Sequence, residues 1–581
     1  MPKTEIVRAS RGANIRSKSK TTIGRVLRVC SLKCVAKPLR LLLCGFSLVG
    51  TITLVSATAL TSEPVHTLVS SSDQTQVVIS MGVVRGTIHD GVREFKGIPY
   101  AAPPTGELRW KLPQPVKPWK GILDASQYGN QCPQLSRYGL TEAAYNEDCL
   151  FLNVTTPEVH GQATAKLPVI VWIHGGAFVG GSSSLYPLAH MALSGDMVVV
   201  SLNYRLGAFG FMGHPAFDRD YDGSYGLEDQ REALRWVQRN ISAFGGDPGN
   251  VTIAGESAGA GSVCMHLLAP QATKDLFQKA IIQSAACMFN MHSVEEADTT
   301  GAKVATKVGC GDQASALSCM QGKPVKDLLE AASAAAGSDL MAYVPVVGNK
   351  SQPLQGAEAI PKGKFVAVPI LDGGNRDELR LYVAYDVQAG KTVTTQNYSA
   401  YLKAVYGDHT EAVLAQYPAD LYSSPATTLG SVMSDYSPAV GLTNCGYLQM
   451  AETASRFTKV YQYEFADSNA PPVTTDPGFE MGAVHSAELP YFFPHFSNTT
   501  KLDGPDLAPA SQKLADQMMQ YWTSFARSGV PISAGSAAWS AFQSSSRVMR
   551  FEPGKVGEYD AGAGHRCDFW KKLYPSLTQS P

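Results

Sequence analysis

Short apolar runs rich in Val and Ile recur along the chain: Pro168–Ile173, Met197–Leu202, Val251–Ala254, Ala280–Ile282, Ala367–Leu371 and Val460–Phe465. Runs of this length are typical of buried strands. Helical periodicity lies between them, because apolar residues in Leu227–Phe244 are spaced 7, 3 and 4 apart, and those in Ser511–Arg527 are spaced 4, 4 and 3 apart. Gly529 and Pro531 then end the second helix. Alternating strands and helices predict an α/β fold with a mostly parallel central sheet flanked by helices.

The length of the chain does not require several domains. A chain of 581 residues would carry about four domains on the usual prior. However, no long linker, charge block or repeat divides residues 75–575, and 44% of the residues are apolar against 17% charged. This composition is that of a globular protein and excludes disorder over most of the chain. We therefore expect one domain over residues 78–575, preceded by a short mature segment at residues 61–77.

The N-terminal 60 residues differ from the rest in charge. Residues 1–40 contain eleven Lys or Arg and one acid, whereas residues 41–60 are uncharged and end near Ala57-Thr58-Ala59. A basic region, an apolar region and an A-x-A site predict a secretory signal peptide over residues 1–60. Twenty uncharged residues could also remain as a membrane anchor. Either reading predicts a body outside the cytoplasm: secreted or periplasmic in the first case, membrane-anchored in the second.

The body of the chain, residues 61–581, carries a net charge of about −11, and the whole chain carries −1. Nucleic-acid binding requires a basic face, so no nucleic-acid partner is expected.

Residues 250–268 carry a candidate nucleophile. Val251–Ala254 is a predicted strand that runs into Gly255-Glu256-Ser257-Ala258-Gly259, and an apolar helical stretch follows. A G-x-S-x-G turn between a strand and a helix exposes a serine hydroxyl for attack. The alternative is a tight structural turn, because the five-residue pattern by itself is weak.

A glycine-rich loop follows the predicted strand that ends at Ile173. The run reads Trp172-Ile173-His174-Gly175-Gly176-Ala177-Phe178. Such a loop exposes backbone N–H groups that stabilise an oxyanion. No G-K-[ST] follows it, which disfavours a nucleotide-binding loop.

Two later segments offer an acid and a base. Asp372 to Glu378 follow one predicted strand, and Gly482 to Glu488, with His485 at the centre, follow another. The chain order nucleophile, acid, base is typical of this kind of fold. The acid could be Glu378, Asp377 or Asp372 on this reasoning. Nothing resembles H-E-x-x-H, so no metal site is predicted.

Longer runs extend these motifs: Phe95–Arg109, Glu147–Asn153, Trp172–Phe178, Asn203–Gly207 and Phe244–Gly259. Together they resemble the type-B carboxylesterases, the α/β-hydrolase family that includes the cholinesterases. The resemblance implies a triad of Ser257, Glu378 and His485, and an oxyanion hole formed by the N–H groups of Gly176, Ala177 and Ala258. It also implies that Glu256 belongs to a buried polar network beside the triad and that Ser284 is a partner of the acid.

The activity implied by this resemblance is that of a serine carboxylesterase, which hydrolyses carboxylic esters through an acyl-enzyme intermediate. A lipase, a lactonase or an acyltransferase would use the same triad. A non-catalytic, cholinesterase-like adhesion protein is disfavoured, since such relatives usually lack a triad member. We expect a small-molecule ester substrate and no cofactor, and a membrane partner only if the N-terminal segment remains as an anchor.

The cysteines carry further expectations from the resemblance. Six of them match family pairs, namely Cys132–Cys149, Cys310–Cys319 and Cys445–Cys567, although six cysteines allow fifteen connectivities on spacing alone. Cys264 and Cys287 are left over and are expected to be buried thiols. Cholinesterases bind choline through a tryptophan in the loop that corresponds to residues 132–149. This loop contains no Trp, which argues against choline esters.

Overall fold

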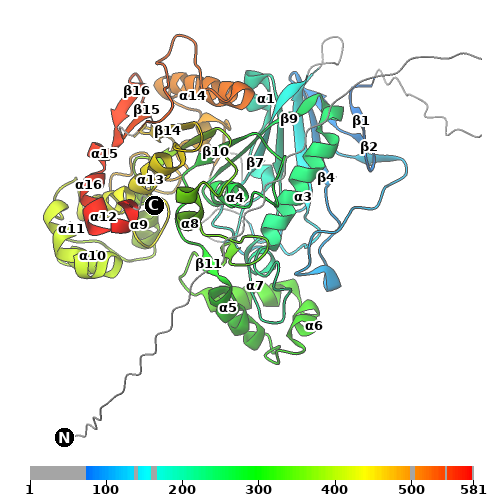
Figure 1. The fold of residues 1–581 in the computed structure, drawn as a ribbon, viewed down its shortest axis with the longest axis horizontal. Helices are drawn as coiled ribbons and strands as arrows, with labels where there is room; N and C mark the ends of the chain where they lie inside the picture. The colour runs from blue at the N-terminus through cyan, green and yellow to red at the C-terminus, as the bar shows by residue number, and fades with distance from the viewer. Residues whose placement is uncertain (1–72, 137–141, 159–165, 498–503, 544–545, 579–581) are drawn as a thin grey trace, which may run out of the picture. The chain divides into compact units, whose positions relative to one another are not determined.

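Seven parallel strands form the centre of an eleven-stranded sheet in the computed structural model, which describes residues 73–578 except 137–141, 159–165, 498–503 and 544–545. The parallel run extends from β15 to β8. Figure 1 labels β15, β14, β10, β9 and β7 of this run. In spatial order the strands are β16 (Gly557–Asp560), β15 (Arg547–Phe551), β14 (Val460–Phe465), β13 (Ile370–Asn375), β10 (Lys279–Gln283), β9 (Gly246–Glu256), β7 (Leu167–Ile173), β8 (Val198–Leu202), β6 (Phe151–Pro157), β4 (Val92–Pro99) and β3 (Thr87–His89). The predicted α/β fold with a mostly parallel sheet is confirmed.

The described part of the chain also contains two small sheets and sixteen α-helices. The small sheets are β1 (Gln76–Ile79), β2 (Gly82–Arg85) and β5 (Ile122–Asp124), and β11 (His292–Ser293) with β12 (Val346–Val347). The helices are α1 (Ala189–Gly195), α2 (Gly207–Gly210), α3 (Tyr225–Asn240), α4 (Ala258–Leu267), α5 (Val294–Lys307), α6 (Ala316–Gln321), α7 (Val325–Ala336), α8 (Gly356–Ala359), α9 (Arg380–Gln388), α10 (Tyr398–Tyr406), α11 (Thr410–Gln416), α12 (Pro425–Asp435), α13 (Asn444–Ala454), α14 (Pro509–Ser528), α15 (Ala561–Gly564) and α16 (Cys567–Leu573).

Helices cover both faces of the sheet because its central strands are apolar on both sides. In β7, Val169 and Val171 belong to the core that contains residues of α3 and α4, whereas Ile170 and Trp172 belong to the core that contains residues of α1 and α14. This alternation follows from the two-residue period of a strand. Figure 1 shows α3 and α4 lying across the sheet. The continuous apolar runs of the sequence therefore correspond to strands buried on both faces.

The boundaries of two predicted strands are wrong. The expected strand Val251–Ala254 is the buried middle of β9, which begins at Gly246 and ends at Glu256. The expected strand Ala367–Leu371 is β13, which begins at Ile370 and continues to Asn375. Pro369 precedes it and has no N–H for a ladder bond. At its other end β13 continues through Asp372-Gly373-Gly374-Asn375, which is polar and rich in glycine yet fully buried. A hydrophobic pattern does not detect such a strand end.

Four disulfides occur among the described residues: Cys132–Cys149, Cys264–Cys287, Cys310–Cys319 and Cys445–Cys567. Three of them are the pairs implied by the resemblance. The expectation that Cys264 and Cys287 are free thiols is wrong. Cys264 lies on α4 and Cys287 in the segment after β10, and because β9 and β10 are neighbours in the sheet, the fold brings the two cysteines together.

The expected signal peptide or anchor at residues 1–60 lies outside the described residues, as does the expected segment 61–77 up to residue 72. In the described part of the chain, no helix has both the length and the apolar character needed to cross a bilayer.

Candidate active site

Ser257 lies on a sharp turn between the end of β9 and the start of α4. Its backbone has φ 58° and ψ −125°, a strained conformation for a residue with a side chain. The helix packs tightly against the sheet here, because a Cβ atom on Gly259 would lie 2.0 Å from the carbonyl oxygen of Ile173. Glycine is therefore required beside the serine. The Ser257 side chain remains partly accessible, whereas the residues on either side of it are buried.

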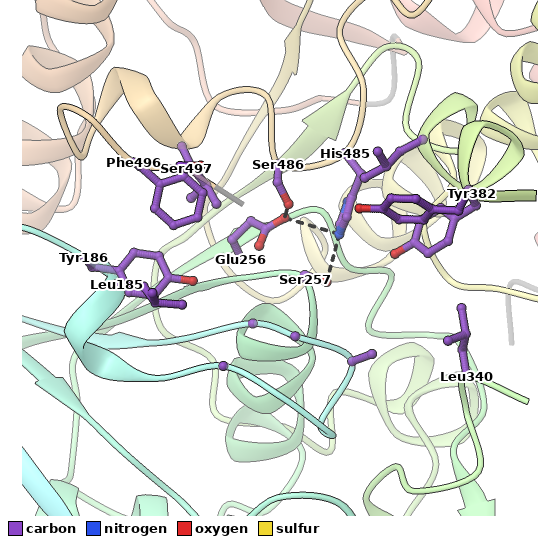
Figure 2. A pocket seen from close by; sticks show the side chains of 17 residues that line it. Leu185, Tyr186, Glu256, Ser257, Leu340, Tyr382, His485, Ser486, Phe496 and Ser497 are labelled. Carbon is purple, nitrogen blue, oxygen red and sulfur yellow. Dashed lines mark hydrogen bonds and ion pairs between the residues drawn. The ribbon is translucent and has the colours of Figure 1, made fainter. Parts of the chain in front are cut away.

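Three side chains from three strand ends meet at this turn. The Oγ of Ser257 lies 2.8 Å from Nε2 of His485, and Nδ1 of His485 lies 2.7 Å from Oε2 of Glu378. Ser257 follows β9, Glu378 follows β13 and His485 lies in the long segment after β14, and the carboxyl ends of these parallel strands share one edge of the sheet. Figure 2 shows His485 pointing towards Ser257. The structure thus brings together the three residues of the predicted triad.

Glu378 is fully buried and is held by two further donors. Its Oε1 accepts a hydrogen bond from the N–H of Asn375 at 2.8 Å and another from the hydroxyl of Tyr447 at 3.0 Å. Sequence reasoning missed Tyr447, which lies 69 positions away on α13. No local motif marks it.

The structure does not support the expected role of Ser284 as a hydrogen-bonding partner of the acid. Its N–H donates to the carbonyl oxygen of Gly373 at 2.7 Å, while its buried hydroxyl has no hydrogen-bond partner among the described residues. The donors to Glu378 are instead Asn375, Tyr447 and His485.

Asp377 and Asp372, the other candidates for the acid, lie in different surroundings. Asp377 accepts hydrogen bonds from Arg376 and lies 3.0 Å from a nitrogen of Arg380. Asp372 lies within β13, where burial raises the pKa of its carboxyl well above the ordinary value. Of the three candidates, Glu378 is the one whose carboxylate contacts His485.

The predicted oxyanion loop lies beside Ser257. Gly176 has φ 109°, and a Cβ atom there would lie 2.2 Å from the carbonyl oxygen of Gly180, so the position requires glycine. Ala177 follows with φ 53°. Ala258 is the first residue of α4, and its N–H is therefore not used by the helix. These N–H groups belong to the segments that border the hydroxyl of Ser257.

Buried carboxylates surround the imidazole. Oε1 of Glu256 accepts a hydrogen bond from the hydroxyl of Ser486 at 2.8 Å and lies 3.3 Å from Nε2 of His485. Figure 2 marks both contacts with dashed lines. Oε2 of Glu488 accepts from Asn375 at 2.7 Å. Burial raises the pKa of both Glu256 and Glu488. Burial alone would lower the pKa of His485, but the carboxylates of Glu256 and Glu378 outweigh this effect and raise it.

Two cavities adjoin Ser257. The smaller, of about 60 Å³, is lined by Glu256, His485 and Ser486 together with Leu185, Tyr186 and Phe496. The larger, of about 230 Å³, is strongly apolar and is lined mainly by Phe178, Phe289, Met341, Met433, Val440 and Leu442. Ala177, Ser257, Leu340 and Tyr382 line both. The nucleophile candidate therefore stands where two spaces of different size and polarity meet.

Within the described residues, no group of three or more His, Cys, Asp or Glu side chains is arranged to hold a metal ion.

Comparison with known proteins agrees with this geometry. The profile of the Carboxylesterase family matches residues 73–570. The para-nitrobenzyl esterase of Bacillus subtilis (strain 168) is 35% identical over 518 residues, which cover 86% of this chain and 98% of that protein. The acetylcholinesterase of Bungarus fasciatus is 31% identical over 561 residues, with 88% of each chain covered. A solved structure of a PNB esterase superposes with a TM-score of 0.70 at 33% identity, covering 86% of this chain and all of that one.

Proposed function

Because this chain belongs to the carboxylesterase family and is a carboxylic-ester hydrolase, we propose that Ser257 is its nucleophile, His485 its general base and Glu378 its orienting acid. The observation that supports this assignment is the chain of contacts from Ser257 Oγ to His485 Nε2, at 2.8 Å, and from His485 Nδ1 to Glu378 Oε2, at 2.7 Å. Such a chain lets an imidazole remove a proton from a hydroxyl while a carboxylate stabilises the imidazolium.

The reaction proceeds in two steps. His485 takes the proton of Ser257 as its Oγ attacks the ester carbonyl carbon, and the N–H groups of Gly176, Ala177 and Ala258 stabilise the oxyanion. His485 then gives the proton to the leaving alcohol, and the acyl group remains on Ser257. His485 then takes a proton from a water molecule as the water oxygen attacks the acyl carbon. The bond from this carbon to Oγ of Ser257 breaks, His485 returns the proton to Oγ, and the acid leaves.

The transfer of a proton from His485 to the leaving alcohol indicates which part of an ester lies in which cavity. The alcohol oxygen must lie close to His485, since this residue protonates it. His485 lines the smaller cavity and is not among the residues that line the larger one. The alcohol part is therefore assigned to the smaller cavity, and the acyl chain to the larger, apolar one. This assignment favours apolar acyl groups of several carbons joined to small alcohols.

A location outside the cytoplasm is also part of the proposal. It is supported by the basic and apolar N-terminal sequence and by four disulfides, which persist in oxidising compartments.

A fluorophosphonate probe together with short-chain aryl esters tests the nucleophile. We expect wild type to be labelled and to hydrolyse the esters, and Ser257→Ala to do neither. Labelling that persists in Ser257→Ala would contradict the assignment. A series of acyl chain lengths then separates an esterase from a lipase, which would prefer long chains, and addition of alcohols or lactones tests the acyltransferase and lactonase alternatives.

A further inference from the structure

Arg380 is the first residue of α9 and lies two positions after Glu378. We infer that Arg380, acting together with Asp377, positions the loop that carries His485 and thereby sets the contact between His485 and Glu378. The inference rests on the proposed function, since it concerns the same triad. It assigns Arg380 a role in catalysis although the residue does not touch the reacting atoms.

The guanidinium of Arg380 joins three segments of the chain. Its Nη2 lies 3.0 Å from Oδ1 of Asp377, and its Nη1 donates to the carbonyl oxygens of Glu480 and Met481, both at 3.4 Å. Its Nε and Nη2 donate to the hydroxyl of Ser431 on α12, at 3.1 and 3.0 Å. The side chain is only 5% exposed, so these contacts are largely shielded from water.

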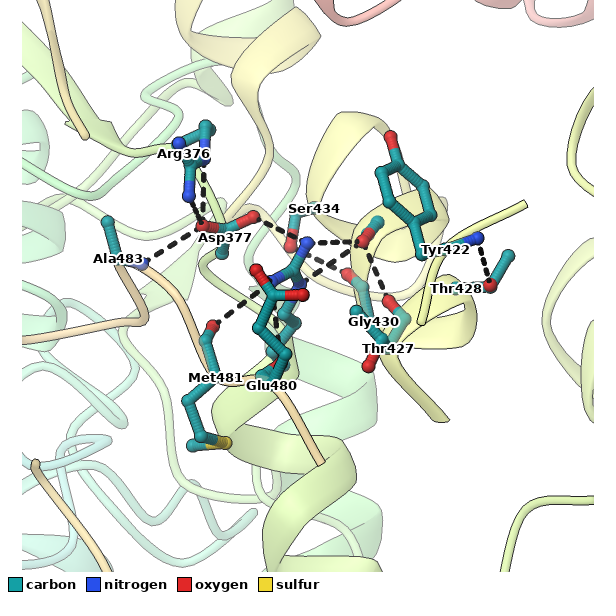
Figure 3. Close-up of polar contacts among 12 residues, drawn as sticks. Arg376, Asp377, Tyr422, Thr427, Thr428, Gly430, Ser434, Glu480, Met481 and Ala483 are labelled. Atoms are coloured by element: carbon teal, nitrogen blue, oxygen red, sulfur yellow. Dashed lines mark hydrogen bonds and ion pairs between the residues drawn. The ribbon is translucent and has the colours of Figure 1, made fainter. Parts of the chain in front are cut away.

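Asp377 completes the connection to the loop of the base. Its Oδ2 accepts from the N–H of Ala483 at 2.9 Å, and its own N–H donates to the carbonyl oxygen of Ala483, also at 2.9 Å. Figure 3 shows Asp377 between Arg376 and Ala483, with Met481 and Glu480 close by. Ala483 is two residues before His485, whose N–H donates to the carbonyl oxygen of Glu378 at 3.3 Å. Hydrogen bonds from Asp377 to Ala483 and from His485 to Glu378 thus hold the segment that carries the acid against the segment that carries the base.

Glycines leave the space that this arrangement occupies. A Cβ atom on Gly430 would lie 2.5 Å from Cγ of Arg380, and one on Gly482 would lie 2.2 Å from Oδ2 of Asp377. Glycine is therefore required at both positions, because any larger side chain would collide with Arg380 or Asp377. An arginine suits the site better than a lysine, because its planar fork reaches a carboxylate, a hydroxyl and two carbonyls at once.

Arg380 acts on the reaction through His485. It is not among the residues that line either cavity next to Ser257. Small displacements of a catalytic group cost up to about 100-fold in rate, so loosening this loop affects turnover more than substrate binding. Poorer alignment with Glu378 also removes part of what raises the pKa of His485.

The test compares Arg380→Met and Arg380→Lys with wild type, using a short-chain aryl ester over a range of pH. We expect kcat to fall by about 10- to 100-fold in Arg380→Met with little change in KM. The acidic limb of the pH profile should move to lower pH, because His485 loses its proton more readily. Arg380→Lys keeps the charge without the fork and should give an intermediate result.

Arg109→Met is a matched control. The side chain of Arg109 is 6% exposed, pairs with Glu147 at 2.6 Å, and donates to the carbonyl oxygens of Met320 and Lys323, each at 2.9 Å. Removing it should lower the melting temperature and leave the pH profile in place. The inference is overturned if Arg380→Met also lowers only the melting temperature, with kcat and the pH profile unchanged.

A second variant decides the matter if Arg380→Met does not fold. Ser431→Ala removes the hydroxyl that accepts from Arg380. It should shift the pH profile in the same direction with a smaller loss of kcat, and an unshifted profile would overturn the inference. Failure of the proposed function is distinguishable, because it would appear as wild type that the fluorophosphonate does not label at Ser257.

Discussion

Asp377 and Glu378 are neighbours in the chain, yet their carboxylates face different partners. Glu378 contacts Nδ1 of His485 at 2.7 Å, whereas Asp377 accepts from the N–H of Ala483 at 2.9 Å and contacts Nη2 of Arg376 at 2.7 Å. The carboxylate of Glu378 thus contacts the imidazole of His485, whereas that of Asp377 contacts the backbone of the loop that carries His485. Substitutions that keep the shape of each side chain separate these two roles.

Glu378→Gln should lower kcat by roughly 10³- to 10⁴-fold, because a neutral amide stabilises neither the correct tautomer nor the charged form of His485. Asp377→Asn should cost only about tenfold, since a loosened loop still carries a complete triad. Steady-state kinetics and circular dichroism on both variants check this. A larger loss in Asp377→Asn than in Glu378→Gln would show that the acid is misassigned.

Glu256→Gln should extend activity to lower pH. The carboxylate of Glu256 lies 3.3 Å from His485 and raises its pKa, so removing the negative charge lowers that pKa. The base is then free at a lower pH, and the acidic limb of kcat/KM should shift downwards by up to about one pH unit. Glu358→Gln, which removes an exposed carboxylate that pairs with Lys362, is the control and should leave the limb in place. A shift to higher pH in Glu256→Gln contradicts the argument.

Ala177→Gly should favour esters of bulky alcohols. Ala177 lines both cavities, and its methyl group narrows the space beside the oxyanion N–H groups. Glycine also fits φ 53° without strain. The measurement is the ratio of kcat/KM for tertiary-alkyl and ethyl esters of the same acid. An unchanged ratio would mean that the methyl does not limit access.

Val440→Phe should shorten the acyl chains that are accepted. Val440 lines the larger cavity and is only partly buried, so a ring at this position fills the space without displacing a packed core residue. Butyrate and hexanoate aryl esters should lose activity while the acetate ester retains it. If the loss instead follows the size of the alcohol at constant acyl group, the assignment of the two cavities is reversed.

The stability of the protein should decrease as the pH rises from about 6.5 to 10, through a buried histidine remote from the triad. His565 lies between Asp435, at 2.5 Å, and Glu464; burial alone would lower its pKa, but these carboxylates raise it to about 10. A folded-state pKa above the unfolded one means that this stabilisation is complete below the unfolded pKa and is lost as the pH rises through the folded one. Melting temperatures of wild type should therefore fall over this range. His565→Gln should start lower, because it leaves buried carboxylates unpaired, and should show a smaller fall, because the raised pKa of His485 still contributes to it.

The sequence predicted best what depends on local patterns. The strand, turn and helix around Ser257 could be identified because periodicity and glycine spacing act over a few residues. Choosing Glu378 over Asp377 required the family resemblance, since both follow the same strand. Tyr447 could not be predicted, because its contact with Glu378 joins segments 69 residues apart. The end of β13 was missed because its buried residues are polar and glycine-rich, so burial there is decided by neighbouring strands.

The disulfide between Cys264 and Cys287 covalently fixes part of the wall of the larger cavity. Cys264 itself lines that cavity, and Cys287 immediately follows Ala285 and Ala286, which also line it. A cross-link reduces the conformations open to the segments it joins. The shape of the space assigned to the acyl group is therefore determined partly by whether the thiols of Cys264 and Cys287 have been oxidised to this disulfide. The selectivity for acyl groups therefore depends on the oxidation state of Cys264 and Cys287.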